Sequence, residues 1–304
     1  MDKIRIGTRG SDLALWQAHF LQDQLKQVGY KSSLTIIKTK GDQIQHLSFD
    51  KIEGKGFFTK EIEDSLLNDE IDVAVHSMKD LPTEQPEGLV LAGTSYRADP
   101  RDVLLIREES KEDTAPLTIG GNRIVGTSSA RRKAQILNLA PGLTIKDIRG
   151  NVPTRIEKLK KGAFDAIILA GAGIERLDLD LSGLHVMNMH VKEFVPAPAQ
   201  GILAYQCRAE NITARRIIKK IHKPEVSRCS NIERGLLNKM EGGCHSPLGI
   251  HCYQDAQGNF HSHVAYAIEI GKPLIHLSLS RSTSHGMVDT LHHMITEKIN
   301  QHAI

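Results

Sequence analysis

The hydrophobic positions of the chain follow a repeating order: a short apolar run, a polar turn, then a segment with apolar residues every three to four positions. Runs of the first kind predict buried strands, and the three-to-four spacing predicts amphipathic helices. The order is clear in "IRIGTRGS" followed by "LALWQAHFLQDQLKQVG", and it recurs in "IDVAVHSMKDLP", "RIVGTSSARRKAQIL" and "FDAIILAGAGIERL". Strands that alternate with helices indicate an α/β architecture with largely parallel sheets.

The pattern changes near residue 217. "RRIIKKIHKPEVSRCSNIERGLLNKM" has helical spacing, whereas "FHSHVAYAIEIGKPLIHLSLSRS" alternates like an antiparallel hairpin with a Gly-Lys-Pro turn. We therefore expect a third, smaller α+β domain at the end of the chain, and 304 residues are enough for two or three domains.

Composition narrows the function classes. A content of 40% hydrophobic and 25% charged residues is ordinary for a globular protein, and a net charge of +3 is too small to indicate nucleic-acid binding. The start "MDKIRIGTRGSDLALW" does not resemble a signal peptide, and no segment approaches the length of an apolar membrane span. We therefore expect a cytoplasmic protein without a nucleic-acid or membrane partner.

The cysteines do not follow a common metal-binding or disulfide pattern. Without a secretory signal, the four cysteines are expected to be reduced. Cys244, His245, His251 and Cys252 lie near one another in sequence, but their spacing matches no common zinc motif, so no metal is expected.

Basic residues recur where predicted strands end, and ligands of open α/β sheets bind beyond the carboxyl ends of strands. In "GTSSARRK", Arg131 and Arg132 fall in the first turn of a helix, where positive charge opposes the helix dipole. They form either a solvated basic patch or an anion site with the serine hydroxyls and free backbone N–H groups. Arg149 and Arg155 repeat the arrangement in "DIRGNVPTRIEKL". The repetition favours a ligand with several carboxylates or phosphates.

Two further segments carry candidate chemistry. Asp80, at the end of the strand in "VHSMKDLP", is either half of a surface ion pair with Lys79 or a group that donates a proton or stabilises a cation. In "NKMEGGCHSPLG", Gly242, Gly243 and the following proline form a tight loop that presents the Cys244 thiol instead of burying it.

Across essentially its whole length, the chain resembles the porphobilinogen deaminase (hydroxymethylbilane synthase) family. The resemblance rests on "RIGTRGSDLALWQA", "EGKGFFTKEIEDSLL", "DVAVHSMKDLP", "DPRDVL", "VGTSSARRKAQI", "IRGNVPTRIEKL", "FDAIILA", "PAPAQG" and "LNKMEGGCHSPLG", in that order. It implies two periplasmic-binding-protein-like α/β domains that form a hinged cleft, and a small α+β C-terminal domain that carries the cofactor cysteine. The expected boundaries are residues 1–95 with 198–216, residues 96–197, and residues 217–304.

The resemblance also implies the chemistry. A dipyrromethane cofactor, joined to Cys244 by a thioether, would serve as the primer. Four porphobilinogen molecules would be added in turn, each losing ammonia, and hydrolysis would release hydroxymethylbilane. The expected enzyme is a monomeric transferase of tetrapyrrole (haem and porphyrin) biosynthesis whose partner is a small molecule, porphobilinogen.

Site residues are transferred from the family motif by motif. Asp80 is the expected catalytic group, which would hydrogen-bond pyrrole N–H groups and stabilise the positive charge formed as ammonia leaves. The residues expected to bind the cofactor are Ser77, Lys79, Thr127, Ser129, Arg131, Arg132, Arg155, Gly243 and Cys244. The residues expected to bind the substrate are Arg9, Ser11, Lys55, Phe58, Arg149, Arg176 and Gln200.

The chain differs from the family motifs at two places, and two other classes of protein are alternatives to the function given above. "PAPAQG" has Pro198 and Ala199 where many relatives read "VGQG", and Lys40 stands where an arginine is frequent. A non-catalytic solute-binding protein would suit the two-domain fold, but the third domain and the absence of an export signal argue against it. A thiol-dependent hydrolase would use Cys244 and the adjacent His245, although adjacency in sequence provides no catalytic geometry.

Overall fold

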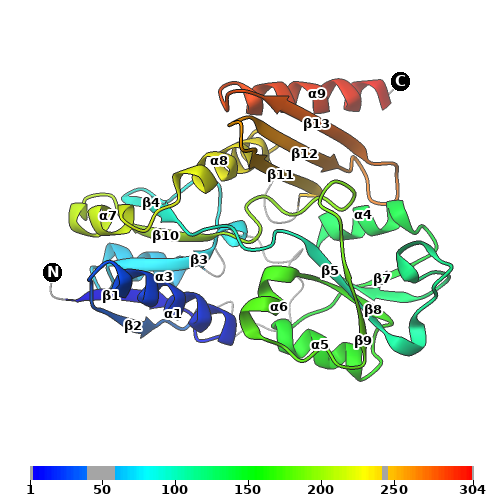
Figure 1. Cartoon of the computed structure of the whole chain (residues 1–304), viewed down its shortest axis with the longest axis horizontal. Coiled ribbons are helices and arrows are strands. Elements are labelled where there is room, and N and C mark those ends of the chain that lie inside the picture. Colours follow the sequence, from blue (N-terminus) through cyan, green and yellow to red (C-terminus); the bar gives the residue numbers. More distant parts are fainter. Residues whose placement is uncertain (1–2, 40–58, 242–245, 303–304) are drawn as a thin grey trace. The chain divides into compact units, whose positions relative to one another are not determined.

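The computed structural model describes residues 3–39, 59–241 and 246–302 of the chain (Figure 1). It contains three sheets and divides into two compact units, Met1–Ala98 with Gly201–Ser227, and Asp99–Gln200 with Arg228–Ile304. The expectation of three domains with the boundaries given above stays a prediction. Within the described ranges, no helix is both long enough and apolar enough to cross a lipid bilayer.

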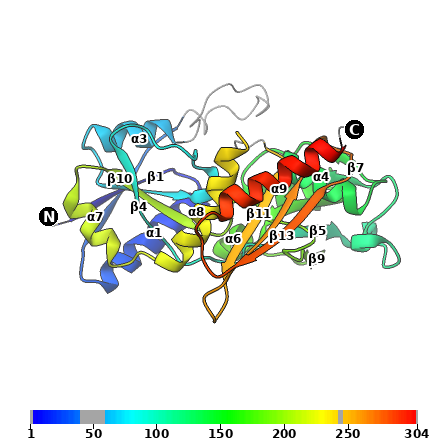
Figure 2. The ribbon, with the colours of Figure 1, turned by 90° about the horizontal axis from the view of Figure 1, so that it is seen from above.

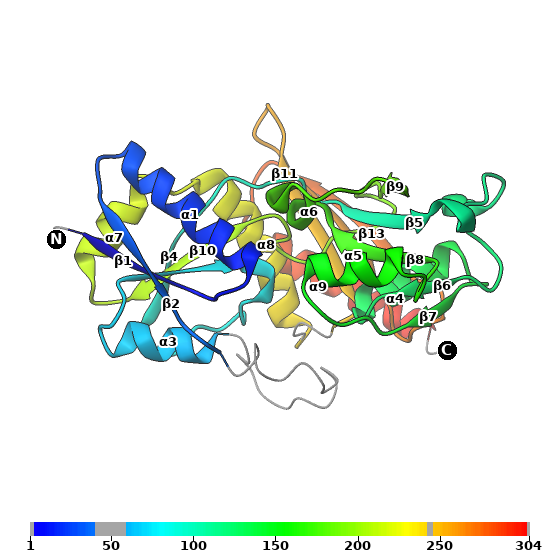
Figure 3. The same cartoon turned by 90° about the horizontal axis from the view of Figure 1, so that it is seen from below.

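The first unit is built on a five-stranded sheet in the order β2-β1-β3-β10-β4. The strands are β1 (Ile4–Thr8), β2 (Ser32–Ile36), β3 (Val73–Ser77), β4 (Leu89–Thr94) and β10 (Leu203–Arg208). Helices α1 (Asp12–Gln27) and α7 (Ile212–Lys219) pack on one face, and α3 (Lys60–Leu67) packs on the other (Figure 3). Both faces are covered because the strands are apolar on both sides, as expected for a buried α/β sheet.

The second unit contains a five-stranded sheet in the order β7-β6-β8-β5-β9. The strands are β5 (Asp102–Arg107), β6 (Ile124–Gly126), β7 (Thr144–Lys146), β8 (Ala166–Ala170) and β9 (Leu184–Asn188). Helix α4 (Ala130–Leu139) covers one face, and α5 (Val152–Lys160) and α6 (Gly171–Leu177) cover the other. Short 3₁₀ turns at Glu108–Ser110 and Pro116–Thr118 follow β5.

The two large sheets share one topology, which confirms the prediction of largely parallel sheets and adds one reversed strand in each. The strands β2, β1 and β3 of the first sheet are parallel to one another, as are β7, β6 and β8 of the second. The fourth strand of each sheet, β10 or β5, runs antiparallel to both of its neighbours. Both antiparallel strands begin within a few residues of a point where the chain passes from one unit to the other. An apolar run has the same pattern in either direction, so the hydrophobic positions could not show this reversal.

The C-terminal part has a small antiparallel sheet of β11 (Leu248–Gln254), β12 (Phe260–Tyr266) and β13 (Ile275–Arg281). Its apolar face packs against α8 (Pro224–Lys239) and α9 (Met287–His302), and Figure 2 shows α9 lying over the strands. Alternate residues of each strand enter this core, as the period of two requires. The α/β fold class and the small C-terminal α+β part predicted from the sequence are confirmed.

Candidate active site

In the first unit, the carboxyl ends of the parallel strands β1 and β3 lie at one edge of the sheet, as the pairing of Ile6 with Val73 requires. This edge carries five of the predicted site residues: Arg9, Ser11, Ser77, Lys79 and Asp80. Ser11 caps α1 by accepting a hydrogen bond from the Ala14 N–H at 3.4 Å. The segments after β1 and β3 are more than 60 residues apart in the sequence, and the parallel pairing of the two strands brings them together.

Asp80 projects from a short 3₁₀ turn, Met78–Asp80, directly after β3. The turn is anchored by two nearly inaccessible side chains, Met78 and Leu81, and by the Met78 N–H, which donates to the Ile202 carbonyl at 2.9 Å. Between these anchors Lys79 is half-buried and Asp80 is exposed. A solvent-accessible carboxylate is thereby held on a rigid turn where the fold places ligands.

The histidine that precedes this turn is not a candidate acid or base. His76 is buried on β3, and its Nε2 lies 3.1 Å from Oε1 of Gln206 on β10. Burial, opposed by the hydrogen bond to Gln206 and aided by the charge of Arg9, lowers the pKa of His76 to about 4. His76 is therefore neutral at physiological pH, and it serves the packing of β3 against β10.

In the second unit, the hydroxyl groups of "GTSS" are engaged in capping. Ser129 is the N-cap of α4, and its Oγ accepts from the Arg132 N–H at 3.4 Å. The Thr127 hydroxyl accepts from the Ser129 N–H at 3.3 Å. The neighbouring Ser128 exchanges hydrogen bonds with the backbone of Ile148, at 3.0 and 3.1 Å. These contacts join the ends of β6 and β7, and they fix the start of the helix that carries the paired arginines.

Arg131 and Arg132 are buried against an internal carboxylate, that of Asp102 on β5. Arg131 Nη1 lies 2.6 Å from Asp102 Oδ2, and Arg132 Nη2 lies 2.7 Å from Asp102 Oδ1. The two arginines are only 4% and 7% exposed, and Asp102 is inaccessible, which excludes the solvated basic patch considered from the sequence. Burial alone would raise the pKa of Asp102, but the two guanidinium charges outweigh it and hold that pKa far below its ordinary value.

Gln200 completes this cluster from the crossing segment. Its Nε2 donates to the Asp102 Oδ1 at 3.0 Å and to the Pro100 carbonyl at 2.8 Å. Arg131 also donates to the Val195 carbonyl and Arg132 to the Ile168 carbonyl, both at 2.9 Å. The cluster joins two positive charges to one negative charge, so it retains a net positive charge in the protein interior.

Sequence reasoning did not single out Asp102. The available signal was an acidic residue at the head of the apolar run "DVLLI", since a charge there needs a buried partner. The partners lie 29 and 30 residues away in the chain, and only the pairing of β5 beside β8 brings them to the start of α4.

Three further predicted arginines of the second unit come after its parallel strands β7 and β8 along the chain. Arg149 follows β7 and is half-buried, and Arg155 lies in the first turn of α5, where its Nε donates to the Gly150 carbonyl at 2.8 Å. Arg176 lies on α6, the helix that follows β8. Gly150 adopts a φ of +116°, which admits the sharp turn between Arg149 and α5.

Some predicted residues fall outside the described part of the chain: Lys55, Phe58, Gly243 and Cys244. The three cysteines within it, Cys207, Cys229 and Cys252, are buried and form no disulfide with one another. Burial raises the pKa of Cys207 to about 11, and a hydrogen bond with Cys229 together with burial raises that of Cys252. These buried thiols are poor nucleophiles, since the thiolate is the reactive form. Among the residues that the structure describes, no group of three or more His, Cys, Asp and Glu side chains could hold a metal ion.

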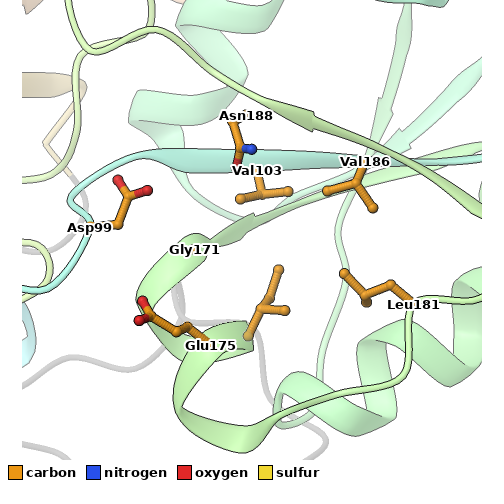
Figure 4. A pocket seen from close by; sticks show the side chains of 8 residues that line it. Asp99, Val103, Gly171, Glu175, Leu181, Val186 and Asn188 are labelled. Carbon is orange, nitrogen blue, oxygen red and sulfur yellow. The ribbon is translucent and has the colours of Figure 1, made fainter.

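A pocket of about 200 Å³ in the second unit is lined by none of the predicted site residues (Figure 4). It is lined by Asp99, Val103, Gly171, Ile174, Glu175, Leu181, Val186 and Asn188. Asp99 and Glu175 are at one end, and the apolar side chains of β5, β9 and α6 form the other. Asp99 is engaged by Arg101 at 2.6 Å, so this part of the pocket contains an ion pair and is not a free acidic site.

Replacing Asp102 with asparagine should strongly destabilise the protein, because it leaves two buried guanidinium groups without their counter-charge. Removing one partner of a buried ion pair typically costs about 3–5 kcal/mol. Asp99→Asn is the matched control, since Asp99 also pairs with an arginine but the two side chains are 30% and 43% exposed. An exposed pair contributes about 0–1 kcal/mol. Urea unfolding of the two variants under the same conditions checks the difference, and equal midpoints would show that Asp102 is not essential to the cluster.

Residues 4–216 match the family model described as "Porphobilinogen deaminase, dipyromethane cofactor binding domain". The porphobilinogen deaminase of Nitratiruptor sp. is 45% identical over 249 residues, which are 82% of this chain and 78% of the relative. That of Chloroherpeton thalassium is 42% identical over 279 residues, 91% of this chain and 86% of the relative.

Among solved structures, the substrate binding domain 2 of Lactococcus lactis GlnP is 11% identical, with a TM-score of 0.45, and the match covers 72% of this chain and 88% of that one. The family match and the level of identity to the relatives are decisive, since both cover more than two thirds of the chain. The chain belongs to the porphobilinogen deaminase family.

Proposed function

We propose that the chain is the transferase that condenses four porphobilinogen molecules, one at a time, onto a covalent dipyrromethane primer and releases hydroxymethylbilane and ammonia in tetrapyrrole biosynthesis. The observation that carries this proposal is the match of residues 4–216 to a dipyrromethane cofactor binding domain. We further propose that the enzyme acts as a monomer in the cytoplasm, with porphobilinogen as its small-molecule partner.

The residues that the structure describes suit a ligand of this kind. Dipyrromethane and its extension products carry an acetate and a propionate on each pyrrole, so they need several cationic partners. Each unit has such side chains after the carboxyl ends of its parallel strands: Arg9 and Lys79 in the first, and Arg149 and Arg155 in the second, with Arg176 in the last turn of the helix after β8. Guanidinium groups bind carboxylates bidentately, which gives orientation as well as affinity.

Arg131 and Arg132 take a particular place in this proposal. Asp102 neutralises one of their two charges and holds both guanidinium groups in fixed positions. The remaining positive charge, in a region shielded from water, would attract a ligand carboxylate more strongly than an exposed charge would. We propose that these arginines bind cofactor carboxylates with the hydroxyl groups of Thr127 and Ser129 nearby, and that their burial also serves the fold.

Asp80 is proposed as the catalytic residue. When bound, the dipyrromethane supplies the free pyrrole position at which the product chain grows. The Asp80 carboxylate would accept hydrogen bonds from pyrrole N–H groups and stabilise the positive charge that develops as ammonia leaves. Its exposure on the rigid turn after β3 leaves it accessible to a ligand, and its neighbour Lys79 would contact a carboxylate. Ser77, whose Oγ accepts from Gln17 Nε2 at 2.8 Å, would support the same edge.

The other proposed contacts follow the family motifs. Ser11 and Gln200 would bind substrate together with the arginines above. Lys55 and Phe58 would cover the ligand, and Gly243 would leave room for the thioether that joins the cofactor to Cys244. These last four residues lie outside the described part of the chain, so their roles rest on the sequence alone.

Ehrlich's reagent tests the proposal on the purified protein. A bound dipyrromethane should give a coloured product, and incubation with porphobilinogen should release ammonia and hydroxymethylbilane. A solute-binding protein or a thiol hydrolase would give neither result. A protein that stays colourless and leaves porphobilinogen unchanged, although purified from cells that make tetrapyrroles, would refute the proposal.

A further inference from the structure

The segment Val195–Gln200, which we call the strap, is held along its length by side chains and backbone of the second unit. The Val195 N–H donates to Gln135 Oε1 at 2.6 Å, and its carbonyl accepts from Gln135 Nε2 at 2.9 Å. Further along, the Pro196 carbonyl accepts from the Ile250 N–H of β11 at 3.0 Å. The strap therefore contacts α4 on one side and the C-terminal sheet on the other.

Glu233 of α8 makes the contact that joins the strap to the C-terminal sheet. Its side chain is completely inaccessible to solvent. Oε2 accepts from the Ala199 N–H, and Oε1 accepts from the Cys252 N–H of β11, both at 2.6 Å. One carboxylate thus connects a helix, a strand and the strap, and it uses each oxygen for a different backbone donor.

The contact falls where the backbone of the strap is strained. Ala199 adopts a φ of +60°, in the left-handed region that residues with a Cβ atom disfavour. Such a conformation persists only where surrounding contacts determine it. A short, charge-assisted hydrogen bond from the Ala199 N–H to Glu233 is a contact of that kind.

The residue after Ala199, Gln200, connects the strap to the arginine cluster. The direction of the chain at Ala199 sets the position of Gln200, whose amide donates to Asp102 Oδ1. Asp102 in turn holds Arg131 and Arg132. All of these side chains are buried, so the path from Glu233 to the arginines consists of packed groups with little freedom to rearrange.

We infer that Glu233 is a positioning residue, which fixes the left-handed strap at Ala199 and through Gln200 orders Asp102 and the two arginines. Its effect on turnover rests on the proposed function, whereas its effect on the strap does not. A carboxylate suits this position because two backbone N–H groups donate to it, and the ring Nδ1 of His251 also lies 3.8 Å from Oε1. Glutamine has the same size but places an NH₂ group against one of the two backbone N–H groups.

The test compares Glu233→Gln with the double variant Glu233→Gln/Ala199→Gly. Hydrogen exchange in peptides that cover residues 195–200 and 248–254 should be about tenfold faster or more in Glu233→Gln, since a hydrogen bond to a charged acceptor is lost. Turnover per cofactor-loaded molecule should fall as well. Glycine adopts a positive φ without strain, so Ala199→Gly should restore much of the turnover and of the slow exchange in residues 195–200. Exchange in residues 248–254 should stay fast, because the Cys252 N–H still lacks the carboxylate.

Glu63→Gln is the matched control. Glu63 is another buried glutamate, and it accepts from Gln206 in the first unit at 3.2 Å. This variant should leave exchange in both peptides at the wild-type rate. Unchanged exchange in Glu233→Gln, or no recovery in residues 195–200 of the double variant, would overturn the inference.

The design separates this inference from the proposed function. If Glu233→Gln fails to fold, the double variant decides: a cooperative melt supports the inference, and the absence of one overturns it. Faster exchange that glycine corrects supports the positioning of the strap even if the wild-type protein does not act on porphobilinogen. In that outcome the proposed function alone is refuted.

Discussion

Replacing Cys244 with serine should remove the entire covalent cofactor and abolish turnover. A serine hydroxyl is far less nucleophilic than a thiolate and does not replace it in forming the thioether. Intact-mass measurement of the wild-type protein should show an excess over the mass of the sequence, and this excess should be absent from Cys244→Ser. The reaction with Ehrlich's reagent should disappear in the same variant.

Cys229→Ser is the control for this experiment, because Cys229 is a buried thiol in the core of the C-terminal part. It should keep both the added mass and the colour reaction. A wild-type protein with the unmodified mass, obtained from cells with an intact tetrapyrrole pathway, would refute covalent attachment. Loss of the added mass from Cys229→Ser, with its retention in Cys244→Ser, would reassign the attachment site.

Asp80→Asn should lower turnover at least about a hundredfold, the low end for general acid–base catalysis. Asparagine keeps the size of the side chain but removes the charge that would stabilise the transition state as ammonia leaves. The fold should tolerate the change, because Asp80 is exposed while Met78 and Leu81 anchor the turn. Ammonia release at saturating porphobilinogen measures the effect, with cofactor content and melting temperature followed in parallel.

Two variants complete this test. Asp80→Glu keeps the charge and moves it by one methylene, so it should lose less activity than Asp80→Asn. Asp64→Asn removes an exposed carboxylate from α3 in the same unit and should have wild-type turnover. Turnover of Asp80→Asn within about threefold of the wild type, with the cofactor retained, would show that the catalytic group is another residue.

Much of the local structure follows from the sequence by itself, because local chemistry decides it. The apolar runs "IRIGT" and "VAVHS" are strands, and Ser11, in the polar turn after the first of them, caps the first helix. The periodicity of the last third correctly indicated helices and an antiparallel hairpin, which is formed by β12 and β13. Caps and periodicity depend on residues within one or two turns, so a sequence reveals them.

Part of the candidate site was also predictable. The rule that ligands bind beyond strand ends selected Arg9, Asp80 and the paired arginines Arg131 and Arg132, and in the structure they follow the strands β1, β3 and β6. The rule could not distinguish an arginine that faces a ligand from one that faces an internal acid. For Arg131 and Arg132 that distinction depends on Asp102, whose position is set by the antiparallel strand β5.

By itself, then, the sequence determined the α/β class, the small C-terminal α+β part, the family and the residue types at the strand ends. The tertiary structure alone decided the direction of β5 and β10, the pairing of Asp102 with two arginines, and the hydrogen bond from the Ala199 N–H to Glu233. The physical reason is distance along the chain. These contacts join residues about 30 or more positions apart, and burial gives them their strength because it removes the competing water.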